Sequence, residues 1–212
     1  MLIQLGTDGN DLINGTADND ILVGLGGDDT INGEAGDDLL SGDDGNDIVN
    51  GGDGNDLLTG GAGKDTLTGG AGQDVFLFSD QPFSGGSPSP TDILTDYQIG
   101  TDKLAFSRFQ FGIDDLSFQS GNSNQLSGNN NLLVLLDPFP NAAAAAQAIA
   151  NNNAITADAG FFVYFNTTLG FSRVVFSQDL SDGGQISVLG NLTNQTNPAN
   201  QGLFSSEDFL LG

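Results

Sequence analysis

Large apolar side chains recur every nine residues through the first third of the chain. They are Ile13, Leu22, Ile31, Leu40, Val49, Leu58, Leu67 and Phe76. An Asp stands two positions before each of them: Asp11, Asp20, Asp29, Asp38, Asp47, Asp56, Asp65 and Asp74. A Gly stands five positions before each Asp: Gly6, Gly15, Gly24, Gly33, Gly42, Gly51, Gly60 and Gly69. This regularity indicates a structural repeat and not an acidic low-complexity linker.

Each nine-residue unit predicts a tight turn followed by a short strand. Gly at the first position, and at the fourth in every unit but the second, permits the positive φ that such turns require. The fourth-position glycines are Gly9, Gly27, Gly36, Gly45, Gly54, Gly63 and Gly72. The residues after the Asp have strand character. A turn and a strand that repeat form a solenoid, in which one unit makes half a coil and odd and even units lie on opposite sheets. The fold class is therefore all-β, a parallel β-roll whose eighth-position side chains form a thin core.

The seventh position predicts a second apolar feature, on the outer surface. Strand alternation points these side chains away from the core. Even units carry apolar residues there without a break, namely Ile21, Leu39, Leu57 and Val75. Odd units carry Leu12, Thr30, Ile48 and Thr66. The stripe on the even face has two interpretations: β-propensity on an exposed strand, or a surface that packs on the rest of the chain or on another molecule.

The composition of the chain limits the classes of molecule and metal that it could bind. The chain has 28 acidic and four basic residues in 212, a formal charge of −24, which argues against binding nucleic acid or anionic membranes and favours cations. It contains no Cys and no His, so the usual ligands of zinc, copper and haem are missing, as are His-based triads. The longest apolar runs, Leu132 to Leu136 and Ala142 to Ala146, are too short to span a bilayer.

Stacking the coils creates an electrostatic problem that a divalent cation solves. Units two apart become neighbours about 4.8 Å apart. Two unit charges at that distance repel by about 0.9 kcal/mol in water and about 3.5 kcal/mol at an effective dielectric of 20. Two Asp carboxylates would neutralise one Ca²⁺, and turn carbonyls, including those of the fourth-position glycines, would supply the remaining oxygens. Eight units give six neighbouring pairs, so we expect up to about six ions and a chain that is unfolded without calcium.

These units resemble the RTX (repeats-in-toxin) calcium-binding family, whose repeat reads G-G-x-G-x-D-x-U-x, with U a large apolar residue. The units that begin at Gly51, Gly60 and Gly69 match in full. The first five units depart at the second position, where they carry Thr7, Thr16, Leu25, Glu34 and Asp43, and the second unit has Asp18 at the fourth. The resemblance implies a parallel β-roll, calcium taken from the medium and export by a type I secretion system.

Composition changes after Phe78, so we expect a β-roll over residues 1–78 and a β-rich capping and secretion domain over 79–212. A Pro- and Gly-rich linker from Pro82 to Pro90 precedes the segment Thr91 to Leu104. That segment is similar to the one that caps the roll in many RTX proteins. Its Asp92, Asp96 and Asp102 are either ligands of a further calcium or turn residues.

The remaining sequence predicts strands and one short helix. The strand candidates are Leu132 to Leu136, Phe161 to Thr167, Phe171 to Phe176 and Gln185 to Leu189. Asn141 is the expected N-cap of a helix over Ala142 to Ala150. The end of the chain, Glu207 to Gly212, is similar to uncleaved signals of type I secreted proteins, and no N-terminal secretory signal is evident.

The sequence favours a secreted, non-enzymatic calcium-binding protein with a structural or self-assembly role. The apolar Leu2, Ile3 and Leu5 predict an uncapped roll edge that could pair with another copy into an oligomer or filament. One alternative is an adhesin or ice-binding surface, although only Thr7 and Thr16 are threonines at the second position. The other is an enzyme that uses a carboxylate pair such as Asp114 and Asp115.

Overall fold

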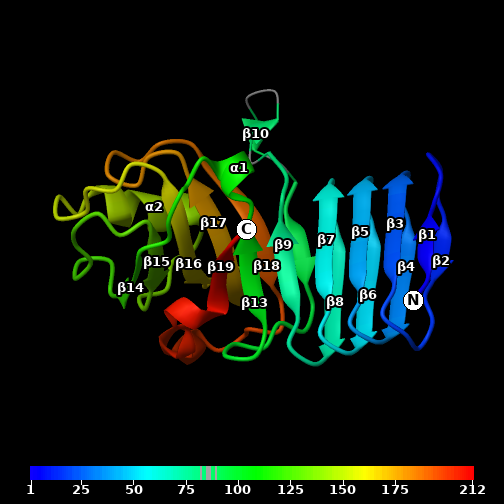
Figure 1. Ribbon diagram of the computed structural model, residues 1–212. Helices are drawn as coiled ribbons and strands as arrows, with labels where there is room; N and C mark the ends of the chain where they lie inside the picture. Colours follow the sequence, from blue (N-terminus) through cyan, green and yellow to red (C-terminus); the bar gives the residue numbers. More distant parts are fainter. Residues whose placement is uncertain (82, 85–86, 89) are drawn as a thin grey trace.

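The computed structural model describes residues 1–81, 83–84, 87–88 and 90–212. The nine strands of the repeat region stack side by side from the N-terminus, and the remainder of the chain packs at their far end (Figure 1). These strands are β1 (Ile3–Leu5), β2 (Leu12–Asn14), β3 (Ile21–Gly26), β4 (Thr30–Ala35), β5 (Leu39–Asp44), β6 (Ile48–Asp53), β7 (Leu57–Ala62), β8 (Thr66–Ala71) and β9 (Val75–Phe78).

The repeat region is a parallel β-roll, as the nine-residue period predicts. Odd-numbered strands pair in the order β1-β3-β5-β7-β9, and even-numbered strands pair in the order β2-β4-β6-β8. The pairing joins residues 18 apart, for example Ile21 with Leu39 and Leu39 with Leu57. Each coil therefore contains two units, one in each sheet.

Eighth-position side chains fill the space between the two sheets. Ile13, Leu22, Ile31, Leu40, Val49, Leu58, Leu67 and Phe76 are each at most 1% exposed. The inward-facing large side chains of β2 to β9 are thus completely buried, and the core is one side chain deep. This confirms the predicted orientation of the repeat.

Both sheets continue beyond the repeats into the C-terminal part of the chain. β13 (Lys103–Phe106) and β19 (Phe209–Leu211) extend the sheet of β9 in parallel. β12 (Asp92–Leu94) extends the sheet of β8 and is followed by β18 (Ile186–Leu192). The sheet then runs through β17 (Phe171–Ser177), β16 (Gly160–Asn166), β15 (Leu132–Leu135) and β14 (Phe118–Gly121). The roll is consequently covered at this end by strands that share its sheets.

The C-terminal part is β-rich, as expected, with few helices. The predicted helix is α2 (Ala142–Ala150), and the Asn141 side chain accepts the Ala144 N–H at 2.8 Å as its N-cap. A four-residue turn of helix, α1 (Arg108–Phe111), and the 3-10 segments η1 (Pro198–Leu203) and η2 (Ser206–Asp208) complete it. A short antiparallel pair, β10 (Phe83–Ser84) and β11 (Ser87–Pro88), falls within the predicted linker. Positions 82, 85, 86 and 89 of that linker lie outside the described residues.

Aromatic side chains join the roll to the C-terminal strands. Phe106 stacks on Phe161 with ring centroids 4.0 Å apart, and Phe111 meets Phe161 and Phe176 edge-on at 5.0 Å. The same buried cluster contains the eighth-position residues of the repeats. A second cluster lies under α2. The phenylalanines are therefore mostly core residues.

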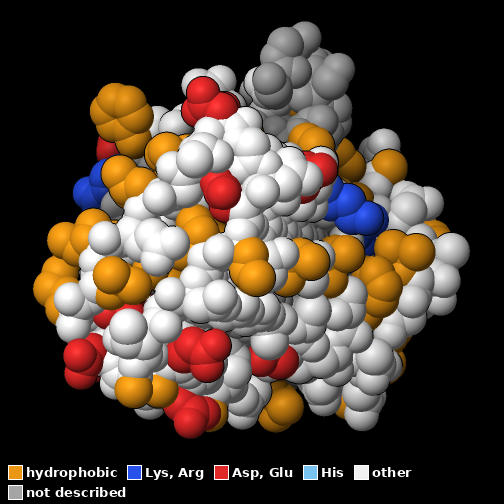
Figure 2. Space-filling view, turned by 90° about the vertical axis from the view of Figure 1, so that its right-hand side faces the viewer, with side chains coloured by type: hydrophobic (Ala, Val, Ile, Leu, Met, Phe, Trp, Pro, Cys, Tyr) orange, Lys and Arg blue, Asp and Glu red, His pale blue; other side chains and the backbone are white. Residues whose placement is uncertain are grey.

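The apolar stripe of the even units lies in register on the outer face of β3, β5, β7 and β9. Leu39 on β5 is 41% exposed, and Ile21, Leu57 and Val75 are half-buried. Viewed from the N-terminal end of the roll, hydrophobic side chains gather across the middle, and acidic ones lie above and below them (Figure 2).

The adjacent residues Leu39 and Leu40 allow a matched test of this core. Leu40→Ala removes a fully buried side chain, and we expect it to lower the unfolding free energy of the calcium-loaded protein by about 2–5 kcal/mol. Leu39→Ala truncates an exposed side chain on the same strand, and we expect a loss below about 1 kcal/mol. Urea unfolding followed by circular dichroism measures both. Equal losses would contradict the assignment of the inward face.

Candidate metal centre

The sixth-position aspartates form two rows, one along each edge of the roll where the turns lie. Asp11, Asp29, Asp47 and Asp65 form the odd row, and Asp20, Asp38, Asp56 and Asp74 form the even row. All but Asp11 are buried, at most 4% exposed. The turns that carry them need glycine: Gly45 has φ 152°, and a Cβ there would collide with the carbonyl oxygen of Gly27 in the preceding turn of the row.

A ladder of hydrogen bonds joins successive turns of each row through these carboxylates. The backbone N–H of one sixth-position Asp donates to Oδ1 of the next Asp in its row. The distances are 2.8 Å (Asp11 to Asp29), 2.7 Å (Asp20 to Asp38), 2.8 Å (Asp29 to Asp47), 2.8 Å (Asp38 to Asp56), 2.8 Å (Asp47 to Asp65) and 3.0 Å (Asp56 to Asp74). Each carboxylate therefore fixes the spacing between its own turn and the one before.

The second oxygen of most of these carboxylates has no hydrogen-bond partner. This holds for the buried Oδ2 atoms of Asp29, Asp38, Asp47, Asp56, Asp65 and Asp74. A buried polar atom without a partner is costly, and a buried charge is more so. Among the described residues, the only ion pairs join the N-terminal amine to Asp18 and Asp20, so no Lys or Arg neutralises these rows.

Backbone oxygens converge on the same places. A Cβ added to Gly42 would collide with Asp47 Oδ2 and lie 2.5 Å from the carbonyl oxygen of Gly60, which belongs to the next turn of the row. From the other direction, the carbonyl oxygen of Gly45 points at Gly63. The space beside Gly42 is therefore lined by one unpartnered carboxylate oxygen and by a carbonyl oxygen of the next turn. This donor set fits Ca²⁺, which takes six to eight oxygen ligands in flexible geometry.

The pKa values of the carboxylates in these rows reflect the same unfavourable burial of charge. Burial raises the pKa of Asp56 to about 6, although the hydrogen bond from the Asp38 N–H lowers it, and the charges of Asp74 and Asp38 raise it further. Burial likewise raises the pKa of Asp74 to about 6. The pKa values of Asp38, Asp47 and Asp65 are raised for the same main reason. Without a metal ion, these carboxylates hold protons more tightly than an exposed Asp does.

The first turn of each row is built differently, which the sequence reasoning missed. Thr7 donates its N–H and its hydroxyl to Asp11 Oδ2, at 2.7 and 2.8 Å. Thr16 makes the same two bonds to Asp20 Oδ2, also at 2.7 and 2.8 Å. Burial would raise the pKa of Asp20, but these bonds and one from the Leu2 N–H lower it. A threonine at the second position thus supplies the hydrogen-bond donors that the later turns lack. Threonine stands at this position only in the first two units, and this is the sequence signal that could have predicted the difference.

The other second-position departures are tolerated at a conformational cost. Leu25, Glu34 and Asp43 have φ values of 78°, 76° and 70°, in the left-handed region that favours glycine. Gly52, Gly61 and Gly70 occupy the same position in the last three units, with φ between 95° and 113°. An L-residue there costs roughly 1–2 kcal/mol. These units keep the turn shape, and with it the carboxylate position, despite the missing glycine.

Fifth-position side chains form an outer ladder that also joins successive turns. Asn10 accepts the Asp28 N–H at 3.0 Å, and Asp28 in turn accepts the Asn46 N–H at 2.8 Å. On the even row, Asn19 and Asp37 act in the same way. These residues support the turns by bonding to the neighbouring turn and not to their own.

The three C-terminal aspartates do not meet at one place. Asp92 Oδ1 accepts the Asp65 N–H at 3.0 Å and so continues the odd row. Asp102 Oδ1 accepts the Asp74 N–H at 3.2 Å and continues the even row. Asp96 accepts the N–H groups of Gly69 and Gly70 at 2.9 and 2.8 Å, one on each oxygen. Asp92 and Asp102 thus occupy the sixth-position role in the last turn of each row.

No three acidic side chains of the described residues converge to form a metal cluster by themselves. The sequence predicts two carboxylates for each pair of consecutive turns, so backbone oxygens would have to supply most of the coordination. The two-carboxylate calcium sites stay a prediction. A parallel β-roll with oxygen-lined turns along both edges is the class of protein that this fold and these sites define.

Comparison with known proteins identifies the repeats. Residues 5–40 and 41–76 each match the family model described as "RTX calcium-binding nonapeptide repeat (4 copies)". Residues 5–76 therefore belong to the RTX family of calcium-binding repeats. No curated protein matches the chain. In the part of the chain that the structure describes, no helix is long and apolar enough to cross a membrane.

Two solved structures are similar to the chain at low identity. They are solution structures of the AlgE6R3 and AlgE6R2 subunits of the mannuronan C5-epimerase from Azotobacter vinelandii. The AlgE6R3 subunit is 18% identical, with 96% of this chain and 79% of that chain covered and a TM-score of 0.40. The AlgE6R2 subunit is 23% identical, with 98% and 91% covered and a TM-score of 0.42. Values this low carry no argument about function.

Asp56 and Asp53 allow a matched test of the rows. In Asp56→Asn the side chain still accepts the Asp38 N–H but loses its charge and places an amide nitrogen or a neutral oxygen in the site. We expect the calcium concentration at the midpoint of folding to rise about tenfold, equivalent to about 1.4 kcal/mol. Asp53→Asn removes an exposed charge from the same unit and should leave the midpoint nearly unchanged. Equal shifts in a calcium titration by circular dichroism would contradict the site.

The raised pKa values predict an inverted pH dependence for the metal-free chain. With pKa values near 6 in the folded state and about 4 when unfolded, Asp56 and Asp74 bind more protons when folded. Their contribution to stability is therefore complete below about pH 4 and is lost as pH rises through about 6. We expect more β-structure at about pH 5 than at about pH 7.5 in chelator, measured by circular dichroism. A β-signal that rises with pH would contradict this.

Proposed function

We propose that this protein is a secreted structural protein that folds when it binds extracellular calcium. The observation that carries the proposal is the set of six buried Oδ2 atoms without a partner, in rows that no basic side chain of the described residues neutralises. Six such atoms agree with about six ions, one for each pair of consecutive turns. Extracellular calcium modules bind at about 10⁻⁴–10⁻³ M, so the chain would stay unfolded inside the cell and fold outside.

Export by type I secretion machinery is part of this proposal. RTX repeats are typical of secreted proteins, and Glu207 to Gly212 has the acidic and apolar pattern expected of an uncleaved signal. In the folded chain, β19 contributes part of that segment to the sheet beside β13. A signal that is accessible only before folding suits a chain that calcium folds after export.

The proposed role after secretion is non-enzymatic self-assembly through the open end of the roll. In the described residues β1 pairs only with β3, and β2 only with β4, so each sheet ends in an unpaired edge. Ile3, Leu5 and Leu12 at this end are 61–66% exposed. Unpaired strand edges with exposed apolar residues pair readily with other chains. Together with the stripe on β3, β5, β7 and β9, they favour a filament, matrix or surface layer.

The alternatives have less support. Asp114 and Asp115 are exposed in the loop between α1 and β14, and within the described residues no hydrogen bond orients either carboxylate, as a catalytic pair would require. Thr7 and Thr16 direct their hydroxyls to Asp11 and Asp20, which leaves no regular hydroxyl array at the second position for ice or surface binding.

A calcium titration followed by circular dichroism and light scattering tests the two parts of the proposal separately. We expect β-structure to appear with millimolar calcium and the mass to rise above that of one chain. Leu12→Lys should leave the β-structure signal in circular dichroism intact and abolish the species larger than one chain. A charged side chain on an edge strand disfavours pairing with another chain. A chain that gains no β-structure contradicts calcium-driven folding. A folded chain that remains a monomer contradicts only self-assembly.

A further inference from the structure

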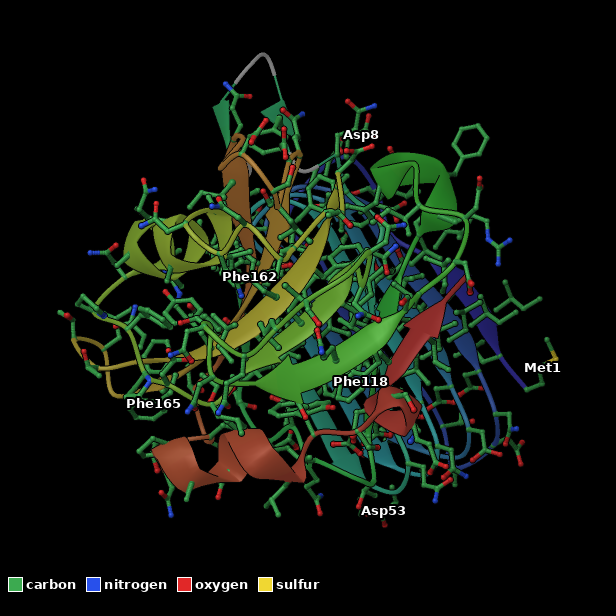
Figure 3. The ribbon with its side chains drawn as sticks, turned by 90° about the vertical axis from the view of Figure 1, so that its left-hand side faces the viewer. Met1, Asp8, Asp53, Phe118, Phe162 and Phe165 are labelled. Atoms are coloured by element: carbon green, nitrogen blue, oxygen red, sulfur yellow. The ribbon has the colours of Figure 1, made fainter. Side chains whose placement is uncertain are left out.

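Three Asn-Gly pairs stand at the same place in alternate repeats. They are Asn14-Gly15, Asn32-Gly33 and Asn50-Gly51. No other Asn of the chain precedes a Gly. Each Asn is the ninth residue of an odd unit, so the three side chains lie in register on the outer face of β2, β4 and β6. These strands run between the two margins of turns, where Asp8 and Asp53 lie on opposite sides (Figure 3).

The side-chain amides of these residues form a hydrogen-bonded ladder along that face. Asn50 donates from Nδ2 to Asn32 Oδ1 at 2.8 Å, and Asn32 donates from Nδ2 to Asn14 Oδ1 at 2.8 Å. Asn32 and Asn50 are half-buried, whereas Asn14 is exposed on the outermost strand of its sheet. Within the described residues, Asn14 therefore has a ladder neighbour on one side, where Asn32 has one on both sides.

The packing of the turns requires the glycine that follows each Asn. A Cβ on Gly15 would collide with the carbonyl oxygen of Gly33, and a Cβ on Gly33 would lie 2.5 Å from the carbonyl oxygen of Gly51. The fold therefore keeps glycine next to the ladder residues. Asn-Gly is chemically the least stable pair that contains Asn, because glycine has no side chain to hinder attack of its backbone nitrogen on the amide.

The reaction open to such a pair is deamidation. The backbone nitrogen of the glycine attacks Cγ of the Asn, so that the N–Cγ bond forms and the Cγ–Nδ2 bond breaks. The side-chain nitrogen leaves as ammonia and takes up the proton of the backbone N–H. Water then opens the five-membered imide at either carbonyl carbon, which gives Asp or isoaspartate. The attack requires the backbone N–H to leave its hydrogen bond and the Asn side chain to turn toward it, which an extended and paired strand prevents.

The three pairs differ in how firmly the fold holds them. Asn32-Gly33 lies inside β4 and Asn50-Gly51 lies inside β6, and both glycines are buried. Asn14 is the last residue of the three-residue β2. Gly15 follows the strand, is half-buried and donates its N–H to the Asn32 carbonyl at 2.8 Å. Since β2 pairs on one side only among the described residues, it opens more easily than β4, which pairs on both sides.

We propose that Asn14 is a site of deamidation in the folded protein, and that stacking protects the identical pairs at Asn32 and Asn50. The proposal rests on calcium-driven folding, since an unfolded chain holds none of the three pairs in a strand. The product at Asn14, Asp or isoaspartate, carries a negative charge on the unpaired edge of the sheet. Ageing of the folded protein therefore adds charge to the edge through which we propose that it assembles, and leaves the interior ladder intact.

The test follows the conversion of each pair by peptide mass spectrometry, in full-length protein incubated at neutral pH with calcium or with chelator. Dilution to a concentration at which light scattering reports single chains keeps the edge of β2 uncovered. With calcium, we expect Asn14 to convert about tenfold or more faster than Asn32 and Asn50, because the rate follows the population of the opened strand. With chelator, the three pairs should convert at similar rates.

Asn14→Gln is the matched control. It keeps an amide but closes a six-membered ring more slowly, so the fast conversion should disappear while Asn32 and Asn50 stay slow. Equal rates at the three pairs of the wild type in calcium, with the β-structure signal retained, overturn the proposal, since the position in the stack then gives no protection. A chain that gains no β-structure signal with calcium, and whose pairs convert equally fast with calcium and with chelator, overturns the proposed function instead.

Discussion

The structure depends on buried carboxylates that link one turn to the next. From Asp29 onward, Oδ1 of each sixth-position Asp accepts the backbone N–H of the turn before it, which sets the register of both sheets. The same side chains bring charges into the interior, and their Oδ2 atoms have no hydrogen-bond donor. The residue that organises the fold therefore also opposes it until a cation arrives. Since the core is only one side chain deep, hydrophobic burial offsets little of the free-energy cost of this buried charge.

The two ends of the roll resolve this conflict in different ways. At the N-terminal end, Thr7 and Thr16 donate hydrogen bonds to the oxygens that elsewhere remain unpartnered. At the other end, Asp92 and Asp102 continue the two ladders, and the neighbouring strands β12 and β13 continue the sheets. The C-terminal part is thus an extension of the roll, with its aromatic core added to the aliphatic one. Closure of the roll at this end therefore uses the same ladder of carboxylates as the repeats.

The period of nine residues predicted the roll, its two sheets and its core, because Gly, Asp and an apolar residue each have one geometric role in the unit. The helix that begins at Ala142 was also predicted from the sequence, by its N-cap and its run of alanines. The pairing of Asp92 with Asp65, and of Asp102 with Asp74, could not be predicted from the sequence. Their spacings of 27 and 28 residues interrupt the period of 18 residues. The left-handed conformations of Leu25, Glu34 and Asp43 also run against local preference and follow from the neighbouring turns.

The central claim is that divalent cations occupy the spaces between consecutive turns. A crystal structure of the calcium-saturated protein, with anomalous difference maps recorded to detect calcium, tests it most directly. The account predicts peaks between consecutive turns of both rows, each within about 2.3–2.6 Å of a sixth-position carboxylate oxygen. Turns that hold only water, with the Oδ2 atoms of Asp47 and Asp56 still unpartnered by metal, would contradict it.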